Sequence, residues 1–331
     1  DQQKLNAQMQ SMLSLEDAAL QKILDLVIPP GTGDDTKARM AIESLSRYLS
    51  QAGMEDDRDR WERMILEKIA AADDAQVQSF FIRQLNYFGT EASLTRLSAY
   101  LSDPVLQDPS IRAMRDIDPA KAADLFTAQL QNCQGRSLIA LVNAIQQTGN
   151  SNHAEAIANL EGSGSPELQR SVLACLAKLG NPESQKLLSN AAKKAAYRPE
   201  PTRATVSLLV YAGTLAKKGL ESQSLKICNT VIKKCVDADQ DAFKCAALRI
   251  AAGNQETGQS QSLLTEAMKD KSKAYRMTAI RYAAAHNSPA DPWIKALQNA
   301  RDSEVTSEIL SLFGMLQSKE AAALVSTYLN N

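Results

Sequence analysis

The sequence has few aromatic residues and no long apolar run. Phe, Trp and Tyr make up 5% of its 331 residues, so a hydrophobic core has to rest on Leu, Ala, Ile and Val. No stretch approaches the roughly 20 apolar residues that a membrane-spanning helix needs, and we expect no membrane insertion. The net charge of −1 and the pI of about 6.3 provide no overall positive field for nucleic acid, whose binding depends on neutralised phosphates.

With two histidines and five cysteines, the chain has few candidate His and Cys ligands for a metal centre. The cysteines form no Cys-x-x-Cys pair, and His153 and His286 lie far apart, so no zinc-ligand spacing is present. We therefore expect no metal and no cofactor. Both histidines fall near expected turns, which favours a surface or capping role. Cys228 and Cys245 lie on two sides of a turn, so a disulfide between them is one alternative and buried free thiols are the other.

One segment, residues 24–35, looks at first like a phosphate-binding loop. Its PPGTG follows an apolar run, but Ile28 stands where the first glycine of G-x-x-x-x-G-K-[ST] belongs. Asp34 and Asp35 follow where Lys and Ser or Thr are required, and two carboxylates would repel a triphosphate. We predict instead that the prolines end one helix and that Asp34 or Asp35 caps the next. The sequence therefore does not predict an ATPase.

A helix–turn–helix unit of about 30 residues recurs along the chain. In residues 170–195, apolar positions follow a helical period, Gly180 ends the helix, and Asn181-Pro182 start a second apolar helix. A helix pair of this kind cannot cover its own apolar face and must stack on its neighbours. Further turns are predicted at Gly89, Asp118-Pro119, Gly149, Gly253, His286-Asn287 and Ser318.

The pattern predicts an all-α fold, a right-handed α–α superhelix arranged as a solenoid. We expect residues 76–331 to form about eight helix pairs and residues 1–75 to form an irregular N-terminal helical cap. Cap and repeats should be continuous as one solenoid. The cap should contain three longer amphipathic helices, because the exposed end of a stack needs an atypical covering unit. Acidic clusters at 55–62 and 71–76 each mark a helix start, where carboxylates complement the helix dipole.

Charge is distributed unevenly along the chain. Residues 1–120 carry 20 acidic and 13 basic residues, whereas residues 186–249 carry 12 basic and 5 acidic ones. On a curved stack, such an excess would mark a face for an acidic partner, and a solvated lysine face is the alternative. Aromatic rings for base stacking are scarce there, so we expect no nucleic acid. The candidate binding residues are Lys193, Lys194, Arg198, Lys217, Lys218, Lys233 and Lys234.

Two units, LACLAKLGNPESQKLL and FIRQLNYFGTEASLTRLSAYLSD, resemble HEAT repeats, the armadillo-like two-helix α-solenoid family. The resemblance covers roughly residues 75–331. The Ala- and Gln-rich style also looks like the HEAT-repeat region of exported Bacteroidetes-type proteins, which in some of them precedes a jelly-roll domain of the 3-keto-disaccharide hydrolase type. No such β-domain is present in this sequence, so no catalytic residue is carried over. Tetratricopeptide repeats are the runner-up, but their residue signature is missing.

The resemblance implies a non-enzymatic scaffold that holds a protein or glycan partner on a concave face formed by the second helices. The alternative is an accessory module or helical-repeat enzyme in carbohydrate processing, which should show a deep pocket with convergent carboxylates. We expect a monomer. Because the sequence does not begin with Met, we expect export to the periplasm or cell envelope after removal of a leader, with a cytoplasmic location as the alternative.

Overall fold

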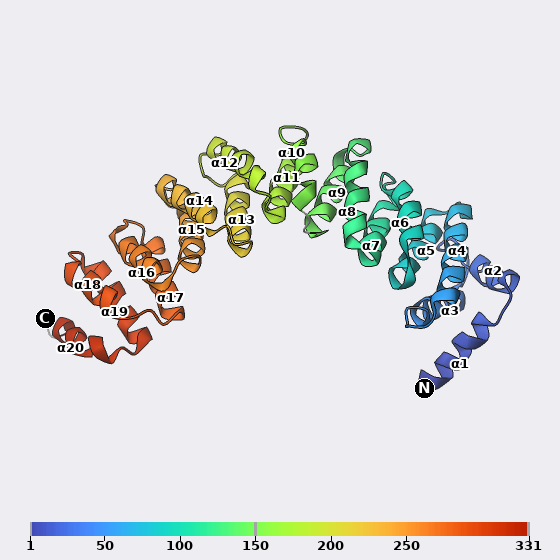
Figure 1. The fold of residues 1–331 in the computed structure, drawn as a ribbon, viewed down its shortest axis with the longest axis horizontal. Helices are drawn as coiled ribbons and strands as arrows, with labels where there is room; N and C mark the ends of the chain where they lie inside the picture. Colours follow the sequence, from blue (N-terminus) through green and yellow to red (C-terminus); the bar gives the residue numbers. More distant parts are fainter. Residues whose placement is uncertain (1, 149–150, 330–331) are drawn as a thin grey trace. The chain divides into compact units, whose positions relative to one another are not determined.

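The computed structural model describes residues 2–148 and 151–329, and over this part of the chain it is helical without any β-strand (Figure 1). The prediction of an all-α fold is confirmed. The chain divides into two compact units, unit 1 (residues 1–171) and unit 2 (residues 172–331), with the boundary inside α11 (Pro166–Leu179). The expected boundary between a cap and repeats at residues 75 and 76 stays a prediction.

Unit 1 contains ten helices before α11 in its described residues, and short 3₁₀ turns extend three of its segments. An amphipathic period produces each longer helix, and the apolar stripe faces the neighbouring helices. The α-helices are α1 (Gln2–Leu13), α2 (Asp17–Asp25), α3 (Thr36–Tyr48), α4 (Glu55–Ala71), α5 (Ala75–Phe88), α6 (Glu91–Leu97), α7 (Gln107–Ile117), α8 (Pro119–Gln129), α9 (Gly135–Thr148) and α10 (Ala154–Ala158). The 3₁₀ helices are η1 (Ser98–Tyr100), η2 (Leu130–Asn132) and η3 (Ser151–His153).

Unit 2 continues from α11 with helices of similar length. Its α-helices are α12 (Gln185–Lys194), α13 (Ala204–Lys217), α14 (Glu221–Lys234), α15 (Asp241–Gly253), α16 (Thr257–Glu266), α17 (Lys273–Ala285), α18 (Asp291–Asn299), α19 (Ser303–Leu316) and α20 (Lys319–Leu329). The 3₁₀ helices are η4 (Pro182–Ser184), η5 (Ala238–Gln240) and η6 (Ala267–Lys269). After Pro199 and Pro201, α13 and α14 form a helix hairpin.

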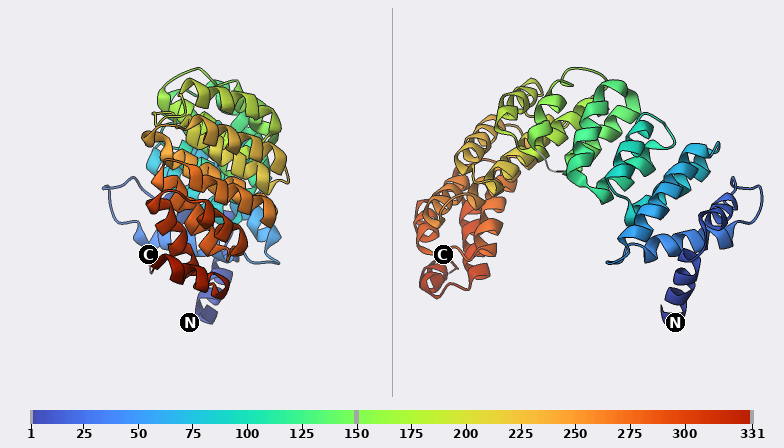
Figure 2. Two further views of the ribbon diagram at one scale, coloured as in Figure 1. Left: turned by 90° about the vertical axis from the view of Figure 1, so that its left-hand side faces the viewer. Right: turned by 45° about the vertical axis from the view of Figure 1, so that its right-hand side comes forward.

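The helices of unit 2 pack in two rows. Successive helices contact each other as α13 with α14, α14 with α15 and α15 with α16, and alternate helices also contact each other. The odd row consists of α13, α15, α17 and α19, each against the next; in the other row α16 contacts α18. Figure 1 shows the odd row along one side of unit 2, and Figure 2 shows its orange helices stacked with similar axis directions. Each helix pair therefore covers its apolar face with its neighbours in the chain.

Unit 1 packs in the same manner, with α3, α5, α7 and α9 in successive contact and α4 against α5. Its largest fully buried side chains include Trp61, Phe81 and Phe126, each less than 2% exposed. The indole nitrogen of Trp61 donates to the Ser46 hydroxyl at 3.2 Å, so the one polar atom of this ring is satisfied inside the core. Aliphatic side chains fill most of the remaining core, as the shortage of aromatic residues requires.

The predicted turns fall where the helices end. Asp118 caps α8, since its carboxylate accepts from the amides of Ala120 and Lys121 at 3.0 Å, and Pro119 is the first residue of that helix. Gly180 has a φ of +60°, and a Cβ atom there would approach Cγ2 of Thr214 to 2.5 Å, so only glycine fits. The predicted turns at Gly89, His286-Asn287 and Ser318 also follow helix ends, and Gly253 is itself the last residue of α15. The predicted turn at Gly149 lies outside the described residues.

The loop that resembles a phosphate-binding motif is closed by its own carboxylate. Asp35 accepts from the amide of Ile28 at 3.0 Å and pairs with Arg39 at 2.8 Å, and Arg39 in turn donates to the carbonyl of Ile28. The hydrogen bond from Arg39 is the main reason that the pKa of Asp35 is lowered. Asp34 accepts from the amide of Thr36, the first residue of α3. The prediction that Asp34 or Asp35 caps this helix is confirmed for Asp34, whereas Asp35 stands at the N-cap without a side-chain capping bond and closes the loop instead.

Glu62 links helices that are far apart in the chain. This residue of α4 is 3% exposed, and its carboxylate accepts from the amide and hydroxyl of Thr90, both at 2.7 Å, and from the amide and hydroxyl of Ser93. These donors belong to the start of α6, where a carboxylate also complements the free amides. A buried side chain of one helix thus caps another helix about 30 residues later.

We expect Glu62→Gln to destabilise the protein by about 1–3 kcal/mol, because an amide cannot accept all of the hydrogen bonds and leaves buried donors unsatisfied. Glu67→Gln, in the same helix but exposed, is the matched control and should change stability by less than about 0.5 kcal/mol. Urea unfolding measures the difference, and amide hydrogen exchange should rise in α6. Equal stability of the two variants would contradict this role of Glu62.

Candidate functional site

The structure divides the predicted basic residues between two ends of their helices. Lys193 and Lys194 lie in the last turn of α12, and Lys233 and Lys234 lie in the last turn of α14. The segments that follow these helices meet, since the Gln240 amide donates to the Ala196 carbonyl at 2.9 Å. These four exposed lysines therefore lie at one end of unit 2. We call this group the lysine end.

Lys217 and Lys218 lie at the opposite end, because α13 and α14 run antiparallel across a short connection. The ammonium group of Lys218 donates to the carbonyls of Leu179 at 2.5 Å and Gly180 at 3.3 Å. It therefore satisfies the last carbonyls of α11, where a cation also complements the helix dipole. Lys218 has a structural role there, and the single face suggested by the sequence is divided.

Arg198 does not present a free charge either. Its guanidinium donates to Asp239 at 2.5 Å and also to Asp237. The hydrogen bond to Asp239 is the main reason that the pKa of Arg198 is raised. This fork joins the segment after α12 to the segment after α14, so its contribution is to hold the lysine end together.

The cysteines lie in the interior. All five, which belong to the described residues, are buried free thiols, and burial raises the pKa of Cys228 to about 11. A thiol with such a pKa carries almost no thiolate at neutral pH and reacts slowly. No bond joins Cys228 to Cys245 in this structure, and a disulfide between them stays a prediction.

The two histidines occupy different environments. His153 is 6% exposed, and its Nε2 lies 2.8 Å from Oδ1 of Asp124 in α8. The expected surface position is therefore wrong. His153 does stand at the N-cap of α10, but its side chain makes no capping hydrogen bond there. His286 is exposed after the end of α17 and stacks on Tyr282, with ring centroids 4.2 Å apart. In the part of the chain that the structure describes, no group of three or more His, Cys, Asp or Glu side chains is placed to hold a metal ion.

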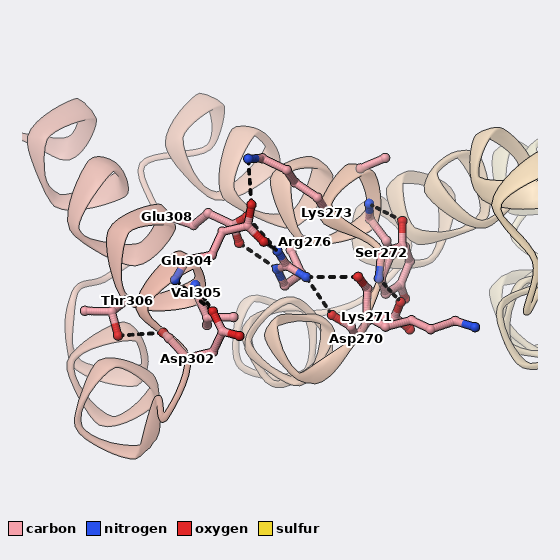
Figure 3. A network of polar contacts seen from close by, with 12 residues as sticks. Asp270, Lys271, Ser272, Lys273, Arg276, Asp302, Glu304, Val305, Thr306 and Glu308 are labelled. Carbon is pink, nitrogen blue, oxygen red and sulfur yellow. Dashed lines mark hydrogen bonds and ion pairs between the residues drawn. The ribbon is translucent and has the colours of Figure 1, made fainter.

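The most extensive polar network surrounds Arg276 of α17 (Figure 3). Its Nε and Nη2 donate to both carboxylate oxygens of Glu308 at 2.7 and 2.9 Å, and Nη2 also donates to Glu304 at 2.6 Å. Its Nη1 donates to the carbonyls of Asp270 and Lys271 at 3.0 and 3.2 Å. A guanidinium has five N–H donors, and all five are used. Arg276 joins α19 to the segment before α17 and has no donor left for a ligand.

A groove of about 830 Å³ lies beside this network, lined by the end of α16, η6, one side of α18, the starts of α17 and α19 and the loops between them. Its carboxylates are engaged within the protein: Asp270 pairs with Lys244, and Glu304 pairs with Lys273 and Arg276. The hydrogen bond from Lys273 is the main reason that the pKa of Glu304 is lowered. A carboxylate with a lowered pKa is a poor general acid near neutral pH, so Glu304 is not suited to donate a proton in this groove.

Comparison with protein-family models finds no match, and no curated protein matches the chain. The structure also contains, among its described residues, no helix that is long and apolar enough to cross a membrane. Function therefore has to be inferred from the surface chemistry of this chain.

Sequence reasoning missed two exposed arginines, Arg249 and Arg281. They stand at the same position of two similar segments, DAFKCAALRIAAG (α15) and KAYRMTAIRYAAA (α17). Aligning these two helices, rather than counting charge over a window, would have found them. The window from 186 to 249 ends at the first of them and excludes the second.

We expect Arg276→Ala to destabilise the protein by about 3–5 kcal/mol, because it leaves Glu308, 6% exposed, buried without a cation. The double variant Arg276→Met with Glu308→Leu should recover most of this loss, since it removes both charges. Lys271→Ala, which changes an exposed neighbour, is the control. Urea unfolding of the four proteins measures the effects. A double variant no more stable than Arg276→Ala would contradict the idea that the loss comes from a buried, unpaired Glu308.

Proposed function

We propose that this chain is a non-enzymatic scaffold of HEAT-like helical repeats that binds a protein partner. The observation that carries the proposal is the number of residues along the chain between the two partners of a polar contact. Glu62 is joined to Ser93 and Gln107 to Ser137 in unit 1, at separations of 31 and 30 residues. In unit 2, Ser272 is joined to Asp241 at 31 residues and Arg276 to Glu308 at 32. A unit of about 30 residues that holds the next one at recurring positions is the expected signature of a helical-repeat stack.

A right-handed superhelix is the arrangement that we propose for these units. Stacked helix pairs leave two long rows of helices on the surface, and such rows bind extended or large partners rather than small molecules. The engaged carboxylates of the groove beside Arg276 favour a scaffold over the alternative of a carbohydrate-processing enzyme. Export, membership of the HEAT family and a monomeric state stay predictions.

The scaffold is tested by capture from extracts of the source cells, with the full chain as bait and the same chain unfolded by heat as control. We expect at least one protein that is retained by the folded bait alone and that rebinds it after purification. If no protein meets both conditions in soluble or envelope extracts, the proposed function is wrong.

The same capture tests the lysine end. Lys233→Glu with Lys234→Glu should weaken retention of a partner that uses this end, and raising the salt concentration should do the same, because exposed charge pairs are screened. Lys22→Glu with Lys37→Glu makes the same change of charge on exposed residues of unit 1 and is the matched control. Equal retention by the two variants would show that the lysine end does not contribute.

A further inference from the structure

The two units carry opposite charge. Residues 1–171 contain 24 acidic and 16 basic residues, whereas residues 172–331 contain 14 acidic and 21 basic ones. The net charge of −1 for the whole chain therefore conceals a net charge of about −8 on unit 1 and +7 on unit 2. A surface of unit 2 that lacks carboxylates has a stronger local field than the overall composition suggests.

The first three helices of the odd row almost lack carboxylates. The segments α13, α15 and α17 contain one acidic residue among them, Asp241, which accepts from the Ser272 hydroxyl at 2.6 Å. Glu200, just before α13, accepts from the amides of Thr202 and Ala204 at 2.6 Å and is also engaged at a helix start. Neither carboxylate is left to neutralise a cation in the middle of these helices.

The exposed side of each helix is a narrow stripe. The stripes begin at Val206 on α13, Ala242 on α15 and Ala274 on α17. Each stripe also contains the residues that follow its first residue by 4, 7 and 11 positions, which lie on the same face of a helix. Apart from Lys217, Arg249 and Arg281, the stripes consist of Ala, Gly, Thr and Val. We call these three stripes together the odd-row face. Small side chains leave room for a second backbone to approach closely.

Arg249 and Arg281 lie at equivalent places on this face. Each is exposed, and each stands four residues before the last residue of its helix. Neither has an ion-pair partner among the described residues, whereas Lys244 and Arg276 on the buried sides of the same helices are both paired. The exposed pair is thus not needed to hold the helices together. On α13 the matching residue is Gly213, and Val210 and Val206, one and two turns before it, are 47% and 39% exposed.

We propose that the odd-row face binds an extended acidic segment of a partner protein, an inference that rests on the proposed scaffold function. Packed helices lie about 8–10 Å apart, and an extended chain advances about 3.3 Å per residue. Carboxylates three residues apart therefore match Arg249 and Arg281. Each guanidinium can bind a carboxylate through two parallel hydrogen bonds.

The same spacing carries the segment across α13 at Gly213, which stands at the place of Arg249 and Arg281 in its stripe. An apolar side chain three residues from the nearer carboxylate lies there, one helical turn from the exposed Val210. The recognised pattern is then apolar-x-x-acid-x-x-acid, in either chain direction. Exposed valines disfavour a phosphate backbone as the ligand, and this face has no exposed aromatic ring on its stripes for base stacking. The face departs from the expectation that the second helices hold the partner, since its helices are the first ones of their pairs.

The test uses the full chain and a fluorescent dodecapeptide, Gly-Ser-Leu-Ser-Ser-Glu-Ser-Ser-Glu-Ser-Ser-Gly, with binding followed by fluorescence anisotropy at low salt. We expect saturable binding that weakens by at least about tenfold, or 1.4 kcal/mol, in the variant Arg249→Glu with Arg281→Glu. Lys226→Glu with Lys295→Glu makes the same change of charge on exposed residues of α14 and α18 and should change the affinity by less than about twofold. Circular dichroism confirms that both variants are folded.

Two further peptides test the chemistry and the spacing. Replacing both glutamates with glutamine should abolish binding, and placing them at adjacent positions should weaken it. Equal affinity of the two charge-reversed proteins would overturn the proposal, as would equal affinity for all three peptides. If oligo-dT bound more tightly than the glutamate peptide and its binding depended in the same way on Arg249 and Arg281, the proposal would be overturned in favour of a nucleic-acid ligand.

The two proposals can fail separately. If none of the peptides binds but the capture experiment still yields a partner that rebinds, the scaffold function stands and the odd-row face is not its acidic-peptide site. If capture also fails, the scaffold function itself is wrong.

Discussion

The structure depends on one constraint: a pair of short amphipathic helices cannot bury its apolar face by itself. In a chain with 5% aromatic residues, each helix offers mainly aliphatic surface, and that surface is removed from water only by the next helices in the chain. The contacts α13–α15, α15–α17 and α17–α19 follow from this requirement. Because the main helix contacts among the described residues are made with near neighbours in sequence, few long loops have to be closed, and such topologies fold rapidly.

Apolar packing alone does not fix how one helix pair is placed on the next, because aliphatic surfaces slide at little cost. Buried polar groups supply that specificity. Glu62 has to meet the amides and hydroxyls of Thr90 and Ser93, and Arg276 has to meet Glu308, or each would be buried without a partner at considerable cost. Lys218 has a related role at the end of α11. These contacts join successive helix pairs near their ends, where free amides and carbonyls are available.

Local rules predicted the features that depend on neighbouring residues. Asp118-Pro119, Gly180 and the loop at Asp34 and Asp35 were all interpretable from a few adjacent residues, because caps and turns are local. Three helices were expected before residue 75, and α2, α3 and α4 lie there with different bounds, but α1 (Gln2–Leu13) was not anticipated since its sequence is largely polar.

Features that depend on residues about 30 apart were not predictable in this way. The burial of His153 against Asp124 and the opposite positions of Lys217 and Lys233 require knowledge of which helix ends meet. A count of charge along the chain adds together residues at opposite ends of a helix and residues on its buried and exposed sides. Only an alignment of α15 on α17 separates the paired Lys244 and Arg276 from the exposed Arg249 and Arg281.

Salt screening limits the distance over which the opposite net charges of the two units act on a partner. At physiological ionic strength the Debye length is about 8 Å, so a net charge of +7 on unit 2 attracts an acidic partner only over short distances. It can raise the rate of encounter, but it cannot distinguish one acidic chain from another. Discrimination has to come from contacts within a few ångströms, where unpaired guanidinium groups at a fixed spacing lie beside exposed apolar side chains. The spacing between Arg249 on α15 and Arg281 on α17 is set by the packing of these two helices. Lys244 of α15 supports that packing, because it pairs with Asp270 just before α17 and its ammonium lies 4.8 Å from the centroid of the Tyr275 ring. The buried cation of α15 therefore holds in place the two helices whose opposite sides carry the exposed arginines.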